Sequence, residues 1–345
     1  MIRAPAPPAT VVVTRGDGID AWHRVAAVVV DGDGRIIHAL GDPDVVTFTR
    51  SAIKPLQALP LCLTGACDSL AIDDEELALA AASHDGGDRQ RDIAARLLAK
   101  AGADAGRLLC GAHWPIGMRL AGRHPCAGED RDPLRSNCSG KHAGFLALAR
   151  TLGAAPERYL DPDSPVQRAV KRAVADACEL DEASLRTGTD GCSAPNFAMP
   201  LASLARGFKN LATRGPAGTP LDAALARVRA AMQAHPLLVS GEDRFDHEMQ
   251  RAFGARVVSK GGAEGLQAIG FGDPPLGIVV KVLDGGDRAC APVCLAVLRE
   301  LGLLQGEALE AVAGRAHPAI TNYRGIETGA IVVPGPLLTA PDNPE

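Results

Sequence analysis

Ser51 and Lys54 lie three residues apart in the stretch Arg50–Gln57, whose pattern predicts a helix. Residues at positions i and i+3 share one face of a helix, so the Ser51 hydroxyl and the Lys54 amine can converge. A neutral serine is a weak nucleophile and needs a base within hydrogen-bond reach. The spacing therefore indicates a serine activated by lysine, although unrelated surface helices carry the same pair by chance.

A lysine must lose its proton before it can act as a base, and its reference pKa of ~10.4 keeps it charged at neutral pH. Working near pH 7 requires that this pKa fall by roughly 3 units, or about 4 kcal/mol. A second buried ammonium and the loss of solvent both act in that direction. Lys260, on a predicted strand, is the candidate, and Gly261 and Gly262 after it would let a substrate approach the backbone closely. The alternative is that these three residues only end a strand and form a turn.

Ser83 stands at the end of an Ala-rich predicted helix and precedes the sequence His-Asp-Gly-Gly. A serine at a helix end is an ordinary polar residue, but beside a cleft it could be a second hydroxyl that carries a proton or attacks a substrate. The order of Ser-x-x-Lys, a serine in a helical region and a Lys-x-Gly strand parallels penicillin-recognising serine enzymes. The parallel is imperfect, because no Ser-x-Asn stands at a plausible place and Lys-Thr-Gly is replaced by Lys260-Gly261-Gly262.

Two cysteines and a lysine form a second chemical group. Cys138 and Lys141 stand three residues apart at the start of a predicted helix, and Cys192 follows Asp190 and Gly191 in a predicted loop. Three side-chain ligands and one water are the open geometry of catalytic zinc sites, with Zn–S bonds of ~2.3 Å. Lysine is an unusual ligand, because its amine must be deprotonated. The spacing leaves two interpretations open, a metal site or buried free thiols.

Size and charge limit the class of protein. The chain has 345 residues and a mass of 35.7 kDa, which exceeds the size at which a single core usually stops growing, so we expect two lobes. Its 36 basic and 41 acidic residues give a net charge of -5, and only 3% of its residues are aromatic. This composition lacks the basic surface and the stacking side chains of nucleic-acid-binding proteins, and disfavours that class.

The N-terminal residues Met1–Pro5 lead into prolines rather than into an apolar signal segment, and no apolar run approaches the ~18–20 residues of a membrane-spanning helix. These features predict a soluble cytoplasmic protein. The nine cysteines are an odd number and lack the density of a small disulfide-bonded domain. We therefore expect reduced thiols.

Short β-rich runs gather at both ends of the chain and helical patterns lie between them. The predicted strands cover residues 10–14, 25–30, 35–38, 256–260, 266–271, 277–282 and 330–333. Helix start signals occur at Asp73, Ser164 and Thr219, and a further helix is expected over 291–304. The pattern predicts an α/β (α+β) fold with a discontinuous sheet lobe of residues 1–72 and 250–345. Residues 73–249 would form a mainly helical lobe, and an active site would lie in the cleft between the two.

Taken together, these motifs resemble the rhizobial-type L-asparaginases, the asparaginase II family, from about residue 10 to residue 335. The stretches that carry the resemblance are Arg50-Ser51-x-x-Lys54-Pro55-x-Gln57, Ser83-His84-x-Gly86, Cys110-Gly111, Asn137-Cys138-Ser139-Gly140-Lys141-His142, Asp190-Gly191-Cys192, Gly241-Glu242-x-Arg244-Phe245-Asp246, Lys260-Gly261-Gly262-Ala263-Glu264-Gly265, and Asp284-Gly285 with Arg288-Ala289. Each stretch alone is a weak signal, but eight in order are specific.

The resemblance implies hydrolysis of L-asparagine to L-aspartate and ammonia by a homodimer. It also implies a fold similar to that of serine β-lactamases and serine-dependent glutaminases. Two Ser–Lys pairs would form the catalytic centre, Ser51 with Lys54 and Ser83 with Lys260.

The resemblance further implies one zinc ion, with Cys138, Lys141 and Cys192 as its ligands. Four residues are expected to contact the substrate: Arg50, His84, Asp190 and Gly261. One departure from the family pattern is visible, because Arg89 and Gln90 stand where many relatives carry a histidine. This departure would affect either the roof of the expected pocket or the substrate preference.

The sequence thus predicts an amidohydrolase in which Ser51, deprotonated by Lys54, attacks the side-chain carboxamide of L-asparagine. Ser83 and Lys260 would relay the proton to the leaving amine, although Ser83 is nearly as good a candidate for the nucleophile. Two alternatives stay open. One is a β-lactamase-like or peptidase-like serine hydrolase, and the other is a zinc-dependent amino-acid-binding protein in which Ser51 and Lys54 only line a pocket.

Overall fold

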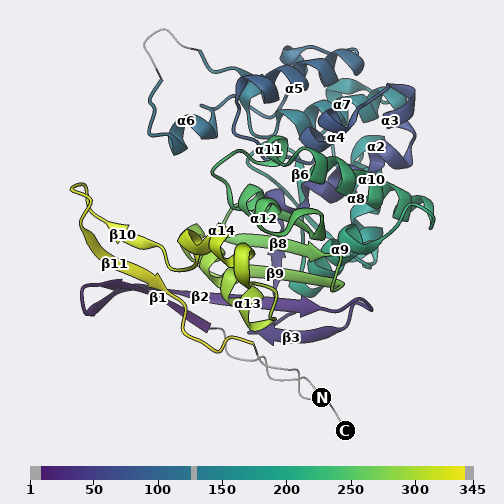
Figure 1. Ribbon diagram of the computed structural model, residues 1–345. Coiled ribbons are helices and arrows are strands. Elements are labelled where there is room, and N and C mark those ends of the chain that lie inside the picture. Colours follow the sequence, from purple (N-terminus) through teal and green to yellow (C-terminus); the bar gives the residue numbers. More distant parts are fainter. Residues whose placement is uncertain (1–8, 126–129, 339–345) are drawn as a thin grey trace. The chain divides into compact units, whose positions relative to one another are not determined.

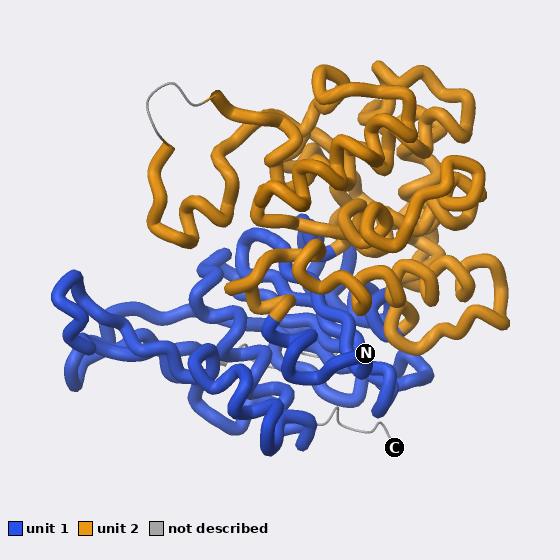
Figure 2. The backbone as a smooth tube through the Cα atoms, turned by 45° about the horizontal axis from the view of Figure 1, so that its top comes forward, with its two compact units in different colours: residues 1–52, 199–209, 248–345 blue, residues 53–198, 210–247 orange. Residues whose placement is uncertain are grey.

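The computed structural model describes residues 9–125 and 130–338 (Figure 1). The chain divides into two compact units (Figure 2). Unit 1 comprises residues 1–52, 199–209 and 248–345, and unit 2 comprises residues 53–198 and 210–247. The sequence predicts a sheet lobe that extends to residue 72, whereas in the structure residues 53–72 form short helices of unit 2.

Unit 1 contains an eight-stranded sheet that is built from both ends of the chain. Its strands are β1 (Ala9–Arg15), β2 (Gly18–Val30), β3 (Ile36–Leu40), β7 (Val257–Gly262), β8 (Leu266–Phe271), β9 (Leu276–Val282), β10 (Ala319–Thr321) and β11 (Glu327–Val332). Their order is β10-β11-β1-β2-β9-β8-β7, and β3 also pairs with β2. The paired strands run antiparallel. The predicted mixed fold, with a sheet from the two chain ends and helices between them, is confirmed.

Local sequence signals explain the hairpin that joins β2 to β3. The Asp31 carboxylate accepts hydrogen bonds from the backbone N–H groups of Asp33 and Arg35, at 3.0 and 2.9 Å. Gly34 takes a left-handed backbone with φ of 79°. The apolar run from Val25 to Val30 is completely buried, as expected for a strand covered on both faces.

Helices complete unit 1. Helix α13 (Cys290–Glu300) packs on β8 and β9, and α14 (Gly306–Ala316) packs against α13 (Figure 1). Unit 1 also includes the first part of α9 (Leu201–Thr213), most of α12 (Phe245–Phe253), and the short strand β4 (Val46–Phe48). A Cβ atom at Gly277 would lie 2.0 Å from the carbonyl oxygen of Ala205, so β9 and α9 can be this close only with glycine at that position.

Unit 2 is mainly helical. Its helices are α1 (Lys54–Gln57), α2 (Leu59–Leu63), α3 (Ala66–Ser69), α4 (Asp74–Ala80), α5 (Asp88–Lys100), α6 (Ile116–Leu120), α7 (Ser139–Thr151), α8 (Pro165–Ala177), α10 (Pro220–Ala234) and α11 (Pro236–Val239). Strand β5 (Arg186–Thr189) pairs antiparallel with β6 (Pro195–Pro200). The start signals predicted at Asp73, Ser164 and Thr219 are confirmed, because each side chain accepts a hydrogen bond from the third residue of its helix.

Helix α7 lies at the centre of unit 2, since all its residues from Ser139 to Ala149 are buried. It packs against α4 and α5. Across the two described ranges, 9–125 and 130–338, no helix is both long and apolar enough to span a bilayer.

Candidate active site

Lys54 is the completely buried first residue of α1, and its amine reaches the loop after α4. Its Nζ donates hydrogen bonds to Ser83 Oγ at 3.0 Å, to the carbonyl oxygen of Ala82 at 2.7 Å and to that of Asn137 at 3.1 Å. An ammonium has three donors, and each finds an acceptor, which offsets the cost of burying the charge. We call these four residues the Lys54 centre.

Backbone contacts hold Ser83 in the Lys54 centre. Helix α4 ends at Ala80, and the Ser83 N–H donates to the carbonyl oxygen of Val239, at 2.9 Å. The family resemblance implies the pairs Ser83 with Lys260 and Ser51 with Lys54. In unit 2 the hydroxyl that Lys54 contacts is Ser83, a contact that the motif spacing did not indicate.

His84 uses both ring nitrogens inside unit 2. Ser139 Oγ donates to the carbonyl oxygen of Leu134 at 2.8 Å, so it accepts a hydrogen bond from His84 Nε2 at 3.0 Å. His84 Nδ1 accepts from the Gly86 N–H, at 3.2 Å. Burial lowers the pKa of His84 to about 3, so the ring is neutral. His84 is predicted to contact the substrate, but this geometry suits it to fixing the loop that carries Ser83.

The other predicted catalytic residues lie in unit 1. Ser51 is half-buried in the 3-10 helix η1 (Arg50–Ile53), which directly precedes α1. Lys260 is buried in β7, and its Nζ donates to the carbonyl oxygen of Gly261 at 2.8 Å. A Cβ atom at Gly262 would lie 2.9 Å from the carbonyl oxygen of Thr49, so the end of β7 runs against the segment before Ser51.

The predicted substrate residues Arg50 and Gly261 belong to this part of unit 1. Arg50 has a left-handed backbone with φ of 47°, which is uncommon for a residue with a side chain. Its guanidinium lies 3.6 Å from the Glu264 carboxylate in the turn after β7. Unit 1 therefore brings together the segments of Arg50, Ser51, Lys260 and Gly261.

The second predicted group also comes together in unit 2. Cys138 directly precedes α7, Lys141 lies in the first turn of that helix, and Cys192 lies in the turn between β5 and β6. Lys141 Nζ donates to Cys192 Sγ at 3.0 Å, and the Cys138 and Cys192 thiols are hydrogen-bonded to each other. We call Cys138, Lys141 and Cys192 the thiol cluster. Half-buried Asp190 adds its negative charge close to Lys141.

The thiol cluster pairs an anion with a cation. A hydrogen bond from the Cys192 thiol lowers the pKa of Cys138 well below its usual value, against the effect of burial, and the charges of Lys54 and Lys141 act in the same direction. The same bond, together with burial, raises the pKa of Cys192. Burial alone would lower the pKa of Lys141, but the charges of Cys192 and Cys138 raise it. Cys138 is therefore a thiolate that the charges of two buried lysines stabilise.

Two thiols and an amine are donors that zinc accepts, provided that the Lys141 amine releases its proton when the metal binds. Bonds of ~2.3 Å to sulfur and ~2.0 Å to nitrogen would set a sulfur and a nitrogen ligand about 3.5 Å apart, slightly more than the 3.0 Å between Lys141 Nζ and Cys192 Sγ. In the part of the chain that the structure describes, no three side chains of His, Cys, Asp or Glu form a metal site. The third protein ligand would therefore have to be Lys141.

Three residues in or beside these centres have contacts that the sequence did not indicate. The Asn137 carbonyl oxygen accepts from Lys54, but backbone acceptors leave no pattern of residue types. Tyr159 lies outside the motifs, and its hydroxyl accepts from the Leu109 N–H at 2.8 Å and lies 2.7 Å from His142 Nδ1. Gly140 matters by its size, because a Cβ atom there would lie 2.3 Å from the Leu79 carbonyl oxygen in α4.

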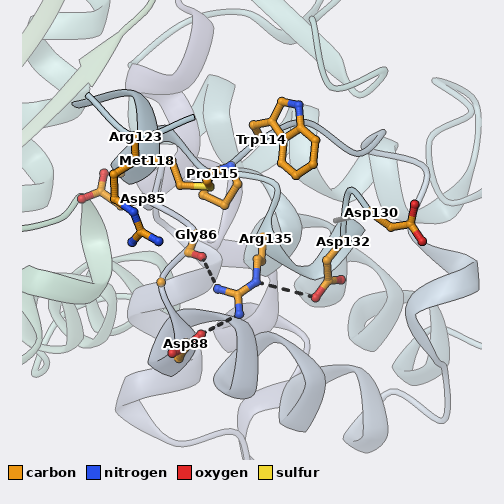
Figure 3. A pocket seen from close by; sticks show the side chains of 12 residues that line it. Asp85, Gly86, Asp88, Trp114, Pro115, Met118, Arg123, Asp130, Asp132 and Arg135 are labelled. Atoms are coloured by element: carbon orange, nitrogen blue, oxygen red, sulfur yellow. Dashed lines mark hydrogen bonds and ion pairs between the residues drawn. The ribbon is translucent and has the colours of Figure 1, made fainter. Parts of the chain in front are cut away.

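A pocket of about 500 Å³ opens beside the loop that follows His84 (Figure 3). It is lined by Asp85, Gly86, Gly87, Asp88, Trp114, Pro115, Gly117, Met118, Arg123, Asp130, Asp132 and Arg135. Arg135 donates to the Gly86 carbonyl oxygen at 2.8 Å and pairs with the carboxylate of Asp88. None of the predicted catalytic or zinc-binding residues lines this pocket, so we do not assign it to the substrate.

The chain is similar to one protein family over nearly its whole length. The family model described as L-asparaginase II matches residues 11–333. No match is found among curated proteins.

Solved structures show weaker similarity. One, titled as Mglu in its native form, is 14% identical with a TM-score of 0.46, and the alignment covers 83% of this chain and 66% of that chain. The chain thus spans slightly less than two thirds of Mglu. A β-lactamase from Mycobacterium bovis, Mb2281c, is 17% identical with a TM-score of 0.42, over 80% of this chain and 94% of that chain. These likenesses are too low to support an argument about function.

Proposed function

The chain belongs to the L-asparaginase II family and is an asparaginase-type amidohydrolase, and from this premise we propose that it hydrolyses L-asparagine to L-aspartate and ammonia. The observation that carries the proposed mechanism is the buried hydrogen bond between Lys54 Nζ and Ser83 Oγ. A lysine amine held against a serine hydroxyl can exchange a proton with it, which is the requirement for serine-dependent amide hydrolysis.

In the proposed reaction the Ser51 hydroxyl attacks the carboxamide carbon and gives its proton to the Lys54 amine. The Lys54–Ser83 hydrogen bond supports a proton path from Lys54 through Ser83 to the leaving nitrogen, and Lys260 is proposed as the second amine of this relay. Ammonia leaves, and water then hydrolyses the ester between aspartate and Ser51. Backbone N–H groups around the oxyanion would each contribute ~2.7–4 kcal/mol, the range found where such donors have been deleted.

We further propose that Cys138, Lys141 and Cys192 hold one zinc ion. When bound, zinc would supply a positive charge that attracts the α-carboxylate or α-amino end of the substrate. The thiol cluster is a hydrogen-bonded group of its own, and it meets the Lys54 centre where the charge of Lys54 stabilises the Cys138 thiolate. The role of these three side chains is therefore to orient the substrate rather than to move its proton.

The test is ammonia release from L-asparagine and L-glutamine by wild type, Ser51→Ala and Ser83→Ala. We expect Ser51→Ala to abolish release and Ser83→Ala to slow it at least a hundredfold, within the ~10²–10⁴ range of general acid–base catalysis. Ser69→Ala, outside the site on α3, is the matched control and should retain wild-type activity. Activity in both serine variants would exclude the hydroxyl mechanism, and loss in Ser83→Ala alone would make Ser83 the nucleophile.

Added hydroxylamine tests the covalent intermediate, because it captures an aspartyl ester as the β-hydroxamate in competition with water. We expect wild type to form the hydroxamate and Ser51→Ala to form none. A penicillin substrate in the same series tests the β-lactamase alternative. Binding of L-asparagine without any turnover would instead support the amino-acid-binding alternative.

The homodimer and the cytoplasmic location that the sequence predicts remain part of the proposal. Light scattering of the purified chain would measure its mass in solution against the 35.7 kDa of one copy. Fractionation of the cells that produce it would test the compartment.

A further inference from the structure

Two further cysteines of unit 2 lie in contact and belong to neither centre of the candidate active site. Cys62 belongs to α2 and Cys67 to α3, and their Sγ atoms are 3.6 Å apart. The chain reverses between them at Gly65, whose φ of 74° is readily adopted only by glycine. A small side-chain rotation would bring the sulfurs from this contact to the ~2.0 Å of a disulfide bond.

The two thiols differ in exposure, which matters for their chemistry. Cys62 is half-buried and thus partly open to solvent, whereas Cys67 is only 1% exposed. Cys178 of the same unit is also buried, and burial is the main cause that raises its pKa. A lone buried thiol of this kind is inert, but a contacting pair with one partly exposed member can react.

A guanidinium lies beside the pair. Arg227, on α10, donates to the Asp68 carboxylate at 2.7 Å, and α10 packs against α2. The hydrogen bond from Cys62 lowers the pKa of Cys67 against the effect of burial, and the Arg227 charge adds to it, while nearby Asp68 opposes it. The same bond, together with burial, raises the pKa of Cys62, so the pair holds a Cys67 thiolate next to a Cys62 thiol, which is the reactive combination.

We propose that Cys62 and Cys67 are a redox modification site that closes to a disulfide when the protein meets hydrogen peroxide. A thiolate sulfur attacks one peroxide oxygen, an S–O bond forms, the O–O bond breaks, and hydroxide leaves and takes up a proton as water. The second thiol then attacks the sulfenic sulfur, an S–S bond forms, and a second water leaves. The two thiols lose two electrons in total, and the peroxide gains them.

The alternative is that both sulfurs only fill space where α2 and α3 meet, as small apolar side chains do. The contact between the sulfurs, the partial exposure of Cys62 and the neighbouring guanidinium all favour the reactive interpretation. The proposal does not depend on the proposed enzyme activity, so each can fail without the other.

The experiment is peroxide treatment of the full-length reduced protein, followed by alkylation of the remaining thiols, trypsin digestion and mass spectrometry. The peptide of residues 51–89 contains Cys62 and Cys67 and no other cysteine, since the bond before Pro55 resists trypsin. We expect this peptide to lose two hydrogens, to escape alkylation, and to regain both thiols with dithiothreitol. Its oxidation should be about tenfold faster than that of Cys178, whose peptide spans residues 173–186.

Cys62→Ser should remove the disulfide and leave a sulfenic acid or a higher oxide on Cys67, and Cys178→Ser should leave the 51–89 result unchanged. Two alkylated thiols in the 51–89 peptide after other cysteines have been oxidised would overturn the proposal. A link from Cys62 or Cys67 to a second chain or to another cysteine would also overturn it. The wild-type measurement decides the question even where a variant fails to fold.

Discussion

Unit 2 contains two buried lysines with different partners, Lys54 in the Lys54 centre and Lys141 in the thiol cluster. Lys54 is 0% exposed and Lys141 is 3% exposed. Lys54 donates to three neutral oxygen atoms, one of them the hydroxyl of Ser83. Lys141 donates to Cys192 and lies beside the Cys138 thiolate, so its proton is held by an anion. Because the two amines are almost equally buried, their partners rather than their burial distinguish them: oxygen atoms at Lys54, and a sulfur beside a thiolate at Lys141.

Removing each amine in turn should give the largest effects and would test most directly whether the two lysines have different roles. We expect Lys54→Met to lower kcat about 10³-fold or more with zinc content unchanged, because the proton acceptor is lost. Lys141→Met should lose zinc and retain more of kcat. Lys209→Met, which replaces a buried lysine outside both centres, is the control for burial alone. Ammonia-release kinetics and metal analysis of the same preparations are the measurements, and equal loss of kcat in both variants would contradict the division of roles.

Cysteine substitutions test the proposed role of the thiol cluster in zinc binding and substrate orientation. We expect Cys192→Ser or Cys138→Ser to bind little zinc and to raise KM roughly tenfold or more with a smaller change in kcat, because a group that orients substrate contributes to binding. Zinc content should also fall with pH in the wild type, since the ligands must release protons to bind the metal. Cys178→Ser is the matched control. Full zinc occupancy in Cys192→Ser would remove that residue from the site.

The pH dependence of stability tests whether neutral His84 holds the loop that carries Ser83. The pKa of His84 in the folded protein is about 3, against about 6.5 in the unfolded chain, so only the unfolded chain takes up a proton between these pH values. The free energy of unfolding should therefore fall as pH falls through this window, by about 1.4 kcal/mol per pH unit from this residue. Urea unfolding of wild type and His84→Gln across this range measures the difference in slope. Parallel curves would contradict the assignment.

The smallest expected effect is that of Tyr159→Phe on stability, and it should leave the Lys54 centre unchanged. Tyr159→Phe would leave the Leu109 N–H and His142 Nδ1 without their partner, at a cost of about 1–3 kcal/mol in the free energy of unfolding. The only other tyrosine, Tyr323, is fully exposed, and Tyr323→Phe should leave stability unchanged. A large drop in kcat for Tyr159→Phe would mean that the two centres are not separate.

Local signals made much of the fold predictable. Asp73, Ser164 and Thr219 mark true helix starts because a cap needs only its own side chain and a backbone N–H three residues ahead. The turn at Asp31–Gly34 is local for the same reason. The division of the chain near residue 52 left no such signal, because it depends on how residues 53–72 pack.

The candidate site was predictable as a set of residues but not as a set of contacts. The motifs identified Lys54, Ser83 and the thiol cluster, yet the bond between Lys54 and Ser83 joins residues 29 positions apart and depends on where α4 ends. The contact of Cys62 with Cys67 was not predicted, because it depends on the left-handed backbone of Gly65, which the spacing of the two cysteines does not reveal.

Gly140, in the first turn of α7, sets the spacing between the thiol cluster and the Lys54 centre. Its missing side chain lets the backbone of α7 touch that of α4, so the helix that begins the thiol cluster lies directly on the helix that leads to Ser83. A methyl group at this position would act as a wedge 2.3 Å from the Leu79 carbonyl oxygen. One added carbon would thereby spread both helices at once, and would shift the thiol cluster relative to the Lys54 centre without altering any reactive atom.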